Sequence, residues 1–344
     1  MIRRSGMNGR SSLVIALALA SGLVLVLIMS EEPMNATRAF FLSVFSNSFY
    51  FGNLLAYSIP LILTGLAASI AFTSSCFNLG MEGQVYLGAL TGTAAGILLA
   101  GKVSGAVGIL VMVIVSFLFG ATAAGISALL KSGLGVNELI SSLLLSNGLV
   151  LVVDYFIEGP LNDRPSGLAA TVSLPDEFRF ERLMLPSNLH SGIIFSIVAA
   201  VTLWFFLFRT REGFKMRIAG KNRRFAYYSG VDTKKVIFWS LFLSGGLAST
   251  AGIIDVIGIH GRVMRGFSSG YGWNGIAIAL IARNHPLMVV PAAVFFAYLE
   301  TGAQIASLEA SVTPEVAKIV QAVIFFLVTA EALIPKGFWR KRYA

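Results

Sequence analysis

Residues 51–72 read FGNLLAYSIPLILTGLAASIAF, and residues 73–84 continue as TSSCFNLGMEGQ. The first stretch has no charged side chain and, as a helix, is long enough to cross about 30 Å of hydrocarbon. The second stretch is polar and contains glycine, and a further apolar run covers residues 79–100. Apolar runs of this length with short polar interruptions predict helices that span a lipid bilayer.

The composition of the whole chain supports the same interpretation. Of its 344 residues, 56% are hydrophobic and only 12% are charged, and the mean hydropathy is +0.79. Soluble domains carry about 25% charged residues, so an ordinary soluble protein is excluded. The net charge is +9, but the basic residues lie in short loops between apolar runs. That distribution is typical of membrane topology, and we expect no nucleic-acid partner.

The apolar runs predict an all-α, polytopic transmembrane bundle of about ten spans, which forms a single domain over residues 1–344. Their approximate bounds are 13–29, 51–72, 79–100, 106–130, 139–157, 191–208, 236–257, 271–282, 287–307 and 316–334. The run 13–29 follows three arginines and resembles a signal peptide. We expect it to remain as the first span, because it is longer than a usual signal core and no small-residue cleavage site follows it.

The charges of the loops predict the orientation of the spans. If the N-terminal arginines lie in the cytoplasm, the loop 158–190 is external and the loop 209–235 is cytoplasmic. The external loop holds five acids against three arginines, whereas the cytoplasmic loop holds nine bases against two acids. We therefore expect both termini in the cytoplasm. Arg262 and Arg265, which fall on the external side, disagree mildly with this orientation.

The sequence offers little for catalysis or metal binding. There is one cysteine, Cys76, and the three histidines lie far apart, so a disulfide framework and a metal-ligand spacing are both excluded. The chain also lacks an HExxH motif, a Gly-x-Ser-x-Gly motif and the Gly-x-x-x-x-Gly-Lys-Ser/Thr loop that binds ATP. We expect no catalytic residue, no metal site and no cofactor bound by this chain, and an intramembrane enzyme is not favoured.

Polar side chains inside a bilayer are costly unless they are paired or face water, so their positions are informative. The segment 74–84 places Asn78, Glu82 and Gln84 between two apolar runs, with glycines as helix breakers. Asn78 and Glu82 are four residues apart, which predicts that they share a helix face. The segment is either a broken helix that lines a solute cavity or a polar turn at the membrane surface.

A second cluster lies at the start of the run 139–157. Asn137 and Ser141 share a face there and are candidates for the solute pathway. Asn137 has the alternative role of capping the helix that follows it.

A third cluster reads GYGWNG over residues 270–275 and opens a run too short to cross the bilayer comfortably. Short, interrupted spans build binding cavities in transporters, so Tyr271, Trp273 and Asn274 are further candidates for the pathway. For the two aromatic rings, the alternative is an interfacial belt.

Other conspicuous residues within the spans have simpler interpretations. Three glycines recur every four residues and predict close helix packing: Gly88, Gly92 and Gly96. Four isolated acids lie near span ends, where we expect most of them to be solvated or to snorkel: Asp154, Asp255, Glu300 and Glu331.

The cytoplasmic loop 209–235 contains a predicted short helix. Asn222 is placed to cap a helix over residues 223–229, and Gly230 is placed to end it. The helix has a basic and aromatic face, which favours docking on a partner protein. The alternatives are that the positive charge fixes the topology or contacts anionic lipid.

At these segments the chain resembles the permease subunits of ATP-binding-cassette importers for nucleosides and simple sugars. The family motif Phe-Asn-(Ile/Leu)-Gly-x-Glu-Gly-Gln stands at residues 77–84, and Asn-Glu-x-Ile-Ser stands at 137–141. Gly-Tyr-Gly-x-x-x-Ile-Ala-x-Ala-Leu stands at 270–280, before Asn-His-Pro-Leu at 284–287. The family's cytoplasmic loop is matched by Gly213, Arg217, Gly220, Asn222, Ala226, Tyr228 and Gly230. The loop departs from the family at Arg223, where proline is usual.

The resemblance implies import by alternating access in a bacterial inner membrane. Its implied partners are a cytoplasmic ATPase subunit that uses the ATP, a second permease subunit (identical or homologous) and an extracytoplasmic substrate-binding protein or lipoprotein. The loop 209–235 then couples the ATPase to the spans, and the polar clusters line the pathway of a nucleoside, a ribose-like sugar or riboflavin. An ion-coupled secondary transporter is the alternative, with Glu82 as its titratable acid.

Overall fold

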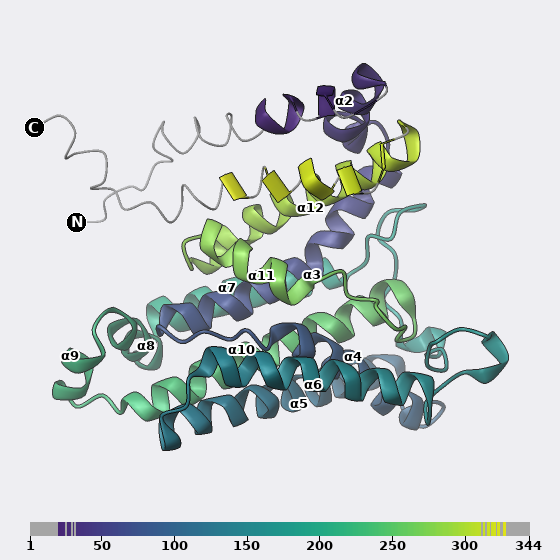
Figure 1. The fold of residues 1–344 in the computed structure, drawn as a ribbon. Coiled ribbons are helices and arrows are strands. Elements are labelled where there is room, and N and C mark those ends of the chain that lie inside the picture. Colours follow the sequence, from purple (N-terminus) through teal and green to yellow (C-terminus); the bar gives the residue numbers. More distant parts are fainter. Residues whose placement is uncertain are drawn as a thin grey trace, which may run out of the picture. The chain divides into compact units, whose positions relative to one another are not determined.

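The computed structural model describes residues 20–24, 26–28, 30 and 32–310, together with the short pieces 312–313, 315–316, 318–320, 322–323 and 326–327. Most of the predicted first span and most of the predicted last span lie outside the described residues. The described part is helical, with isolated β-bridges and no β-strand (Figure 1). Its α-helices are α2 (Pro33–Phe41), α3 (Ser48–Thr73), α4 (Met81–Leu99), α5 (Gly105–Leu134), α6 (Glu138–Glu158), α7 (Gly192–Arg209), α8 (Arg211–Lys221), α9 (Arg223–Tyr228), α10 (Thr233–Asp255), α11 (Tyr271–Ile281) and α12 (Pro286–Glu309).

The predicted all-helical, multi-pass architecture is confirmed. Among the described residues, six helices are long and apolar enough to cross a membrane: α3, α5, α6, α7, α10 with the π-helical turn η4 (Val256–His260), and α12. Two further predicted runs are occupied by helices outside this set, α4 with 19 residues and the shorter α11 with 11 residues. The total of about ten spans and the cytoplasmic position of the termini stay predictions.

The chain forms two compact units. The smaller comprises Met1–Leu54 and Val294–Ala344, and the larger comprises Leu55–Ala293. Within the smaller unit, the Tyr298 hydroxyl donates a hydrogen bond of 2.8 Å to the carbonyl of Phe41 at the end of α2. The residues singled out by their sequence motifs all belong to the larger unit. The prediction of one domain over residues 1–344 stays a prediction.

Helices α4, α5 and α10 form the core of the larger unit, and α6 lies alongside them (Figure 1). The three glycines of α4 face these neighbours, which confirms that they serve helix packing. An added Cβ at Gly92 would lie 2.5 Å from Cγ1 of Ile253 on α10, and one at Gly96 would lie 2.8 Å from the sulfur of Met112 on α5. At Gly88 an added Cβ would collide with the carbonyl of Ser249 on α10. Small residues of this kind allow backbones to approach closely in lipid.

The predicted external loop, between α6 and α7, folds back on the segment that follows η4. Arg265 Nη1 donates to a Glu158 carboxylate oxygen at 2.6 Å, and its Nε lies 3.6 Å from Asp154. Arg262 lies 3.8 Å from Asp163. Arg262 and Arg265 thus each have an acidic partner, which accounts for their departure from the charge pattern. The pairing with Arg265 also shows that Asp154 is not a simply solvated acid.

Replacing Gly88 by alanine tests the close packing of α4. We expect Gly88→Ala to lower the free energy of unfolding by about 1–3 kcal/mol, because the new Cβ overlaps a backbone carbonyl that cannot move aside. Gly133→Ala in α5 is the matched control, since an added Cβ there meets no atom within 4 Å. It should be neutral or stabilising by up to about 1 kcal/mol. Thermal unfolding of the purified full chain in detergent measures both, and equal melting temperatures would contradict this packing.

Candidate functional site

The polar segment between α3 and α4 is a true break in the helices. Helix α3 ends at Thr73 and α4 begins at Met81, and Ser75 lies in the left-handed region with φ +50°. The prediction that Asn78 and Glu82 share a helix face is therefore wrong, because the chain becomes helical only after Gly80. Asn78 belongs to the break, and Glu82 belongs to the first turn of α4.

Asn78 and Gln84 close this break by pairing with each other. The Asn78 amide nitrogen donates to the Gln84 carbonyl oxygen at 2.8 Å and to the Ser244 hydroxyl of α10 at 3.0 Å. The Asn78 carbonyl oxygen accepts from the Gly80 backbone N–H at 3.0 Å. Both amide side chains are only 1% exposed, so they are buried in the helical body and do not form a surface turn.

Helix α6 supplies two hydrogen-bond acceptors to the break and to the first turn of α4. The Ser142 hydroxyl accepts from the Leu79 N–H at 3.1 Å, and the Ser146 hydroxyl accepts from the Gly83 N–H at 2.8 Å. The first N–H groups of a helix have no partner within the helix, and hydrocarbon offers no water to replace one. Sequence reasoning missed both serines, although their spacing of four residues places them on one face of α6.

Two predicted pathway residues lie at the start of α6 beside these serines. The Asn137 side chain accepts from the Leu139 N–H at 2.9 Å, which confirms its capping role, and Asn137 is exposed. Ser141 is half-buried and adjoins Ser142. The next residue after the cap, Glu138, is buried and forms an ion pair with Lys131 at the end of α5.

Glu82 fastens the start of α4 to the start of α11. One carboxylate oxygen accepts from the Ser268 hydroxyl at 2.8 Å, and the other accepts from the Gly272 N–H at 2.8 Å. An added Cβ at Gly272 would lie 2.7 Å from Cα of Glu82, so only glycine permits this approach. A carboxylate is favoured here because the N-terminus of a helix carries a partial positive charge. Ser268 was not predicted as a site residue.

A second acid, Asp255, contacts Tyr271, the first residue of α11. Asp255 is the last residue of α10 and is fully buried, with an exposed fraction of 0%. One of its oxygens accepts from the Tyr271 hydroxyl at 3.4 Å, and the other lies 3.2 Å from Nε2 of His260. Asp255 is thus an exception to the expectation that most of the four isolated acids are solvated or snorkel, because it is fully buried beside a tyrosine and a histidine.

Aromatic rings surround the two carboxylates. Tyr271 meets Tyr57 of α3 edge-on, with 5.6 Å between ring centroids, and Tyr86 of α4 lies 5.0 Å from Phe267. The other predicted residues of α11 differ from Tyr271, because Trp273 is 46% exposed and Asn274 is half-buried. The structure thus brings Asn78 and Gln84 together. It also places Glu82 against the first turn of α11. Asn137 and Trp273 lie exposed on their own helices.

The cytoplasmic loop has the predicted short helix. In α9 the Asn222 side chain accepts from the Phe225 N–H at 3.0 Å, and Gly230 follows with φ +79°. Before α9, the loop contains α8, which sequence reasoning did not predict. Gly213 lets α8 fold back onto the end of α7, since an added Cβ would lie 2.5 Å from Cα of Leu207.

The loop is attached to the break between α3 and α4. The Ser75 hydroxyl donates to the Gly220 carbonyl at 2.6 Å, and Arg223 Nη2 lies 3.5 Å from the Ser75 carbonyl. Gly220 is required here because an added Cβ would collide with the carbonyl of Thr73 at the end of α3. Arg223, the departure from the family pattern, thus contributes to this attachment.

The outer face of α9 does not take part in this attachment to the break. Ala226 is fully buried and anchors the helix, whereas Tyr228 is 84% exposed and Tyr227 is 67% exposed. Arg217 of α8 points elsewhere, with its guanidinium 4.8 Å from the ring centroid of Phe208. The exposed surface of α9 is therefore aromatic and basic, while Arg217 and the glycines hold the loop in place.

Metal ligands do not gather in the described part of the chain, where no group of three or more His, Cys, Asp or Glu side chains is placed to hold an ion. Cys76 is buried. In the predicted external loop, His190 is stacked on Phe180 with 5.6 Å between ring centroids. Burial lowers the pKa of His190 to about 4, so this imidazole is neutral near pH 7.

Residues 50–329 match the protein family described as branched-chain amino acid transport system / permease component. The glucose ABC transporter permease protein TsgB13 of Haloferax volcanii is 31% identical over 94% of this chain and 87% of the relative. The probable riboflavin import permease protein RfuC of Treponema pallidum is 32% identical over 94% and 86%. The guanosine ABC transporter permease protein NupP of Bacillus subtilis is 29% identical over 94% and 93%.

These similarities cover nearly the whole chain. They confirm the resemblance drawn from the sequence motifs. The chain therefore belongs to the family of branched-chain amino acid transport system permease components, and it is a multi-pass membrane permease of the ATP-binding-cassette type.

Proposed function

We propose that this chain is the permease subunit of an ATP-driven, binding-protein-dependent importer. It moves a nucleoside, a ribose-like sugar or a riboflavin-like solute across the cytoplasmic membrane of a bacterium by alternating access. The observation that carries this proposal is the attachment of the loop 209–235, through Ser75 and Gly220, to the break that leads to Glu82. Relatives named for guanosine, riboflavin and glucose support the solute class.

The proposed solute pathway centres on the start of α11. Carboxylates accept hydrogen bonds, and aromatic rings stack on flat rings, so this combination suits a neutral solute with several hydroxyl or N–H donors. Asp255, which is fully buried, is added here as a residue that positions Tyr271. The full set of predicted pathway residues is Asn78, Glu82, Gln84, Asn137, Ser141, Tyr271, Trp273 and Asn274.

The proposed coupling element is the loop 209–235 on the cytoplasmic side. The exposed face of α9 docks on the ATPase subunit, which binds and hydrolyses the ATP. Movement of α8 and α9 then displaces Ser75 and with it the start of α4, and Glu82 transmits this displacement to α11. A second permease subunit and an extracytoplasmic binding protein complete the importer. No relative supports the ion-coupled alternative, and both oxygens of Glu82 already have hydrogen-bond partners.

Uptake by cells tests the solute class. A strain that lacks this subunit should lose most of its uptake of at least one of labelled guanosine, riboflavin and ribose, and the cloned chain should restore it. Uptake that persists after an uncoupler, while ATP is maintained, would agree with an ATP-driven importer. Unchanged uptake of all the candidate solutes in the deletion strain would contradict the proposed solute class.

The variant Gly220→Ala tests the coupling element. We expect solute transport by the reconstituted importer to fall roughly fivefold or more, with ATP hydrolysis retained, because the new Cβ pushes α8 away from the carbonyl of Thr73. Gly133→Ala is the matched control and should transport normally, since its Cβ meets open space. Transport and ATPase rates measured on the same proteoliposomes give the comparison. Normal transport by a correctly assembled Gly220→Ala importer would remove the loop from the coupling path.

A further inference from the structure

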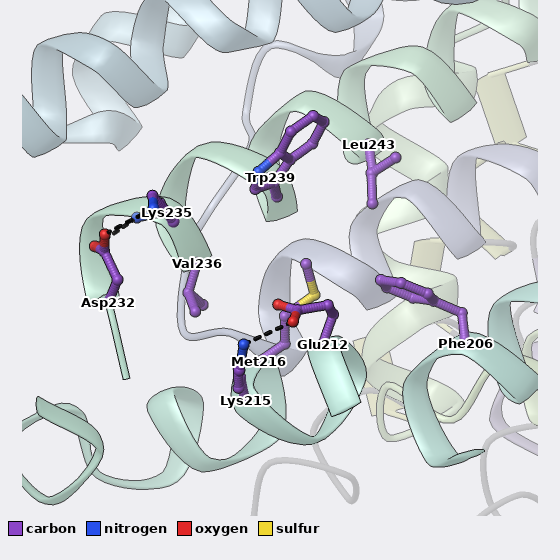
Figure 2. Close-up of a pocket in the computed structure, with 9 residues that line it drawn as sticks. All are labelled: Phe206, Glu212, Lys215, Met216, Asp232, Lys235, Val236, Trp239 and Leu243. Atoms are coloured by element: carbon purple, nitrogen blue, oxygen red, sulfur yellow. Dashed lines mark hydrogen bonds and ion pairs between the residues drawn. The ribbon is translucent and has the colours of Figure 1, made fainter. Parts of the chain in front are cut away.

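A pocket of about 280 Å³ lies between α7, α8 and α10, away from the proposed pathway (Figure 2). Five of its lining side chains are apolar: Phe206, Met216, Val236, Trp239 and Leu243. The other four are charged and belong to α8 and to the start of α10: Glu212, Lys215, Asp232 and Lys235. In Figure 2 the Asp232–Lys235 pair lies at one end of the pocket, and Trp239, Leu243 and Phe206 lie towards the other.

The order of residues along α10 explains this separation. Asp232 caps the helix, and Lys235, Trp239 and Leu243 follow at intervals of four residues on one face. With a rise of 1.5 Å per residue, Leu243 lies about 12 Å further along the helix than Lys235. Since α10 is a membrane span, its charged end lies at the membrane surface and Leu243 lies towards the hydrocarbon. Along α10 the pocket is therefore polar at the surface and apolar at depth, as an amphiphile requires.

The charges at the mouth are balanced. Lys215 lies 2.6 Å from Glu212, and Lys235 lies 3.7 Å from Asp232. All four side chains are substantially exposed, so each can still bind a further group. The backbone N–H of Lys235 lowers the pKa of Asp232, which is ionised at neutral pH. A ligand head with one positive and one negative group matches this mouth, whereas a purely anionic head meets two carboxylates.

We propose that this pocket binds phosphatidylethanolamine from the adjoining membrane leaflet. The lipid phosphate lies against Lys215 and Lys235, and its primary ammonium donates hydrogen bonds to Glu212 and Asp232. The acyl chain nearest the head runs beside Val236 and Trp239 to Leu243. The volume is close to the lower limit of about 300 Å³ for ligand sites, so the pocket holds one part of the lipid and the rest stays in the bilayer. The charged residues of this site belong to the loop 209–235, but the lipid proposal does not require that this loop couples ATP hydrolysis to transport.

Native mass spectrometry of the purified full chain tests the site with three lipids at equal concentration: phosphatidylethanolamine, phosphatidylglycerol and phosphatidylcholine. We expect the wild type to retain phosphatidylethanolamine roughly threefold to tenfold better than either competitor. Phosphatidylglycerol has no cation for the carboxylates, and the quaternary ammonium of phosphatidylcholine has no N–H to donate. Equal retention of the three lipids would overturn the proposal.

Filling the pocket provides the second arm of the experiment. Leu243→Trp should reduce the retention of phosphatidylethanolamine to the level of the competing lipids. Leu151→Trp is the matched control, because Leu151 is 71% exposed on α6 and does not line the pocket. Both variants must elute as the wild type does and melt within a few degrees of it. Undiminished retention by Leu243→Trp would place the bound lipid elsewhere and overturn the proposal.

Neutralising the two acids should reverse the preference. In Glu212→Gln/Asp232→Asn the lysines remain, so the mouth becomes positive and phosphatidylglycerol should bind better than phosphatidylethanolamine. Asparagine keeps the oxygen that caps α10, which preserves the start of the helix. The double variant therefore changes the charge of the pocket mouth without removing the cap at the start of α10. A preference for phosphatidylethanolamine that survives this change would contradict the assigned role of the carboxylates.

Discussion

Backbone N–H groups at a helix start within the membrane must find partners in the protein, because hydrocarbon supplies no water. At the start of α4, three side chains accept hydrogen bonds from backbone N–H groups. Ser142 and Ser146 of α6 accept from Leu79 and Gly83, and Asn78 accepts from Gly80. Leaving such a buried group unpaired costs about 1–3 kcal/mol, so these contacts determine where the helix starts.

The same constraint connects the break to its neighbours. Glu82 of α4 accepts a hydrogen bond from the N–H of Gly272 at the positive N-terminal end of the short helix α11. Asp255 of α10 accepts a hydrogen bond from the Tyr271 hydroxyl. On the other side of the break, Ser75 donates to the carbonyl of Gly220 in α8. The segment is therefore in contact with both the cytoplasmic loop and the start of α11. We therefore propose this segment as the element that transmits a displacement of the loop to α11 during transport.

Much of the architecture could be predicted from the sequence because its signals are local. Apolar runs locate the helices to within a few residues, and Asn222 and Gly230 delimit α9 by capping rules that involve only neighbouring residues. The site depends on contacts between distant segments. Nothing near Asp255 in the sequence indicates that Tyr271, on the next helix, donates a hydrogen bond to it. Helix α8 was not predicted because its basic sequence has only a narrow apolar face. The shared face of Asn78 and Glu82 was wrong because spacing rules hold only inside a helix.

The central claim is that Glu82 fastens the first turn of α11 to α4, and amide hydrogen exchange measures this directly. The full chain carrying Glu82→Ala should exchange the amides of residues 271–274 about tenfold faster than the wild type, because the Gly272 N–H loses a charged acceptor. Glu177→Ala, at an exposed acid of the predicted external loop, should leave this exchange unchanged. Equal protection of residues 271–274 in the wild type and in Glu82→Ala would contradict the account.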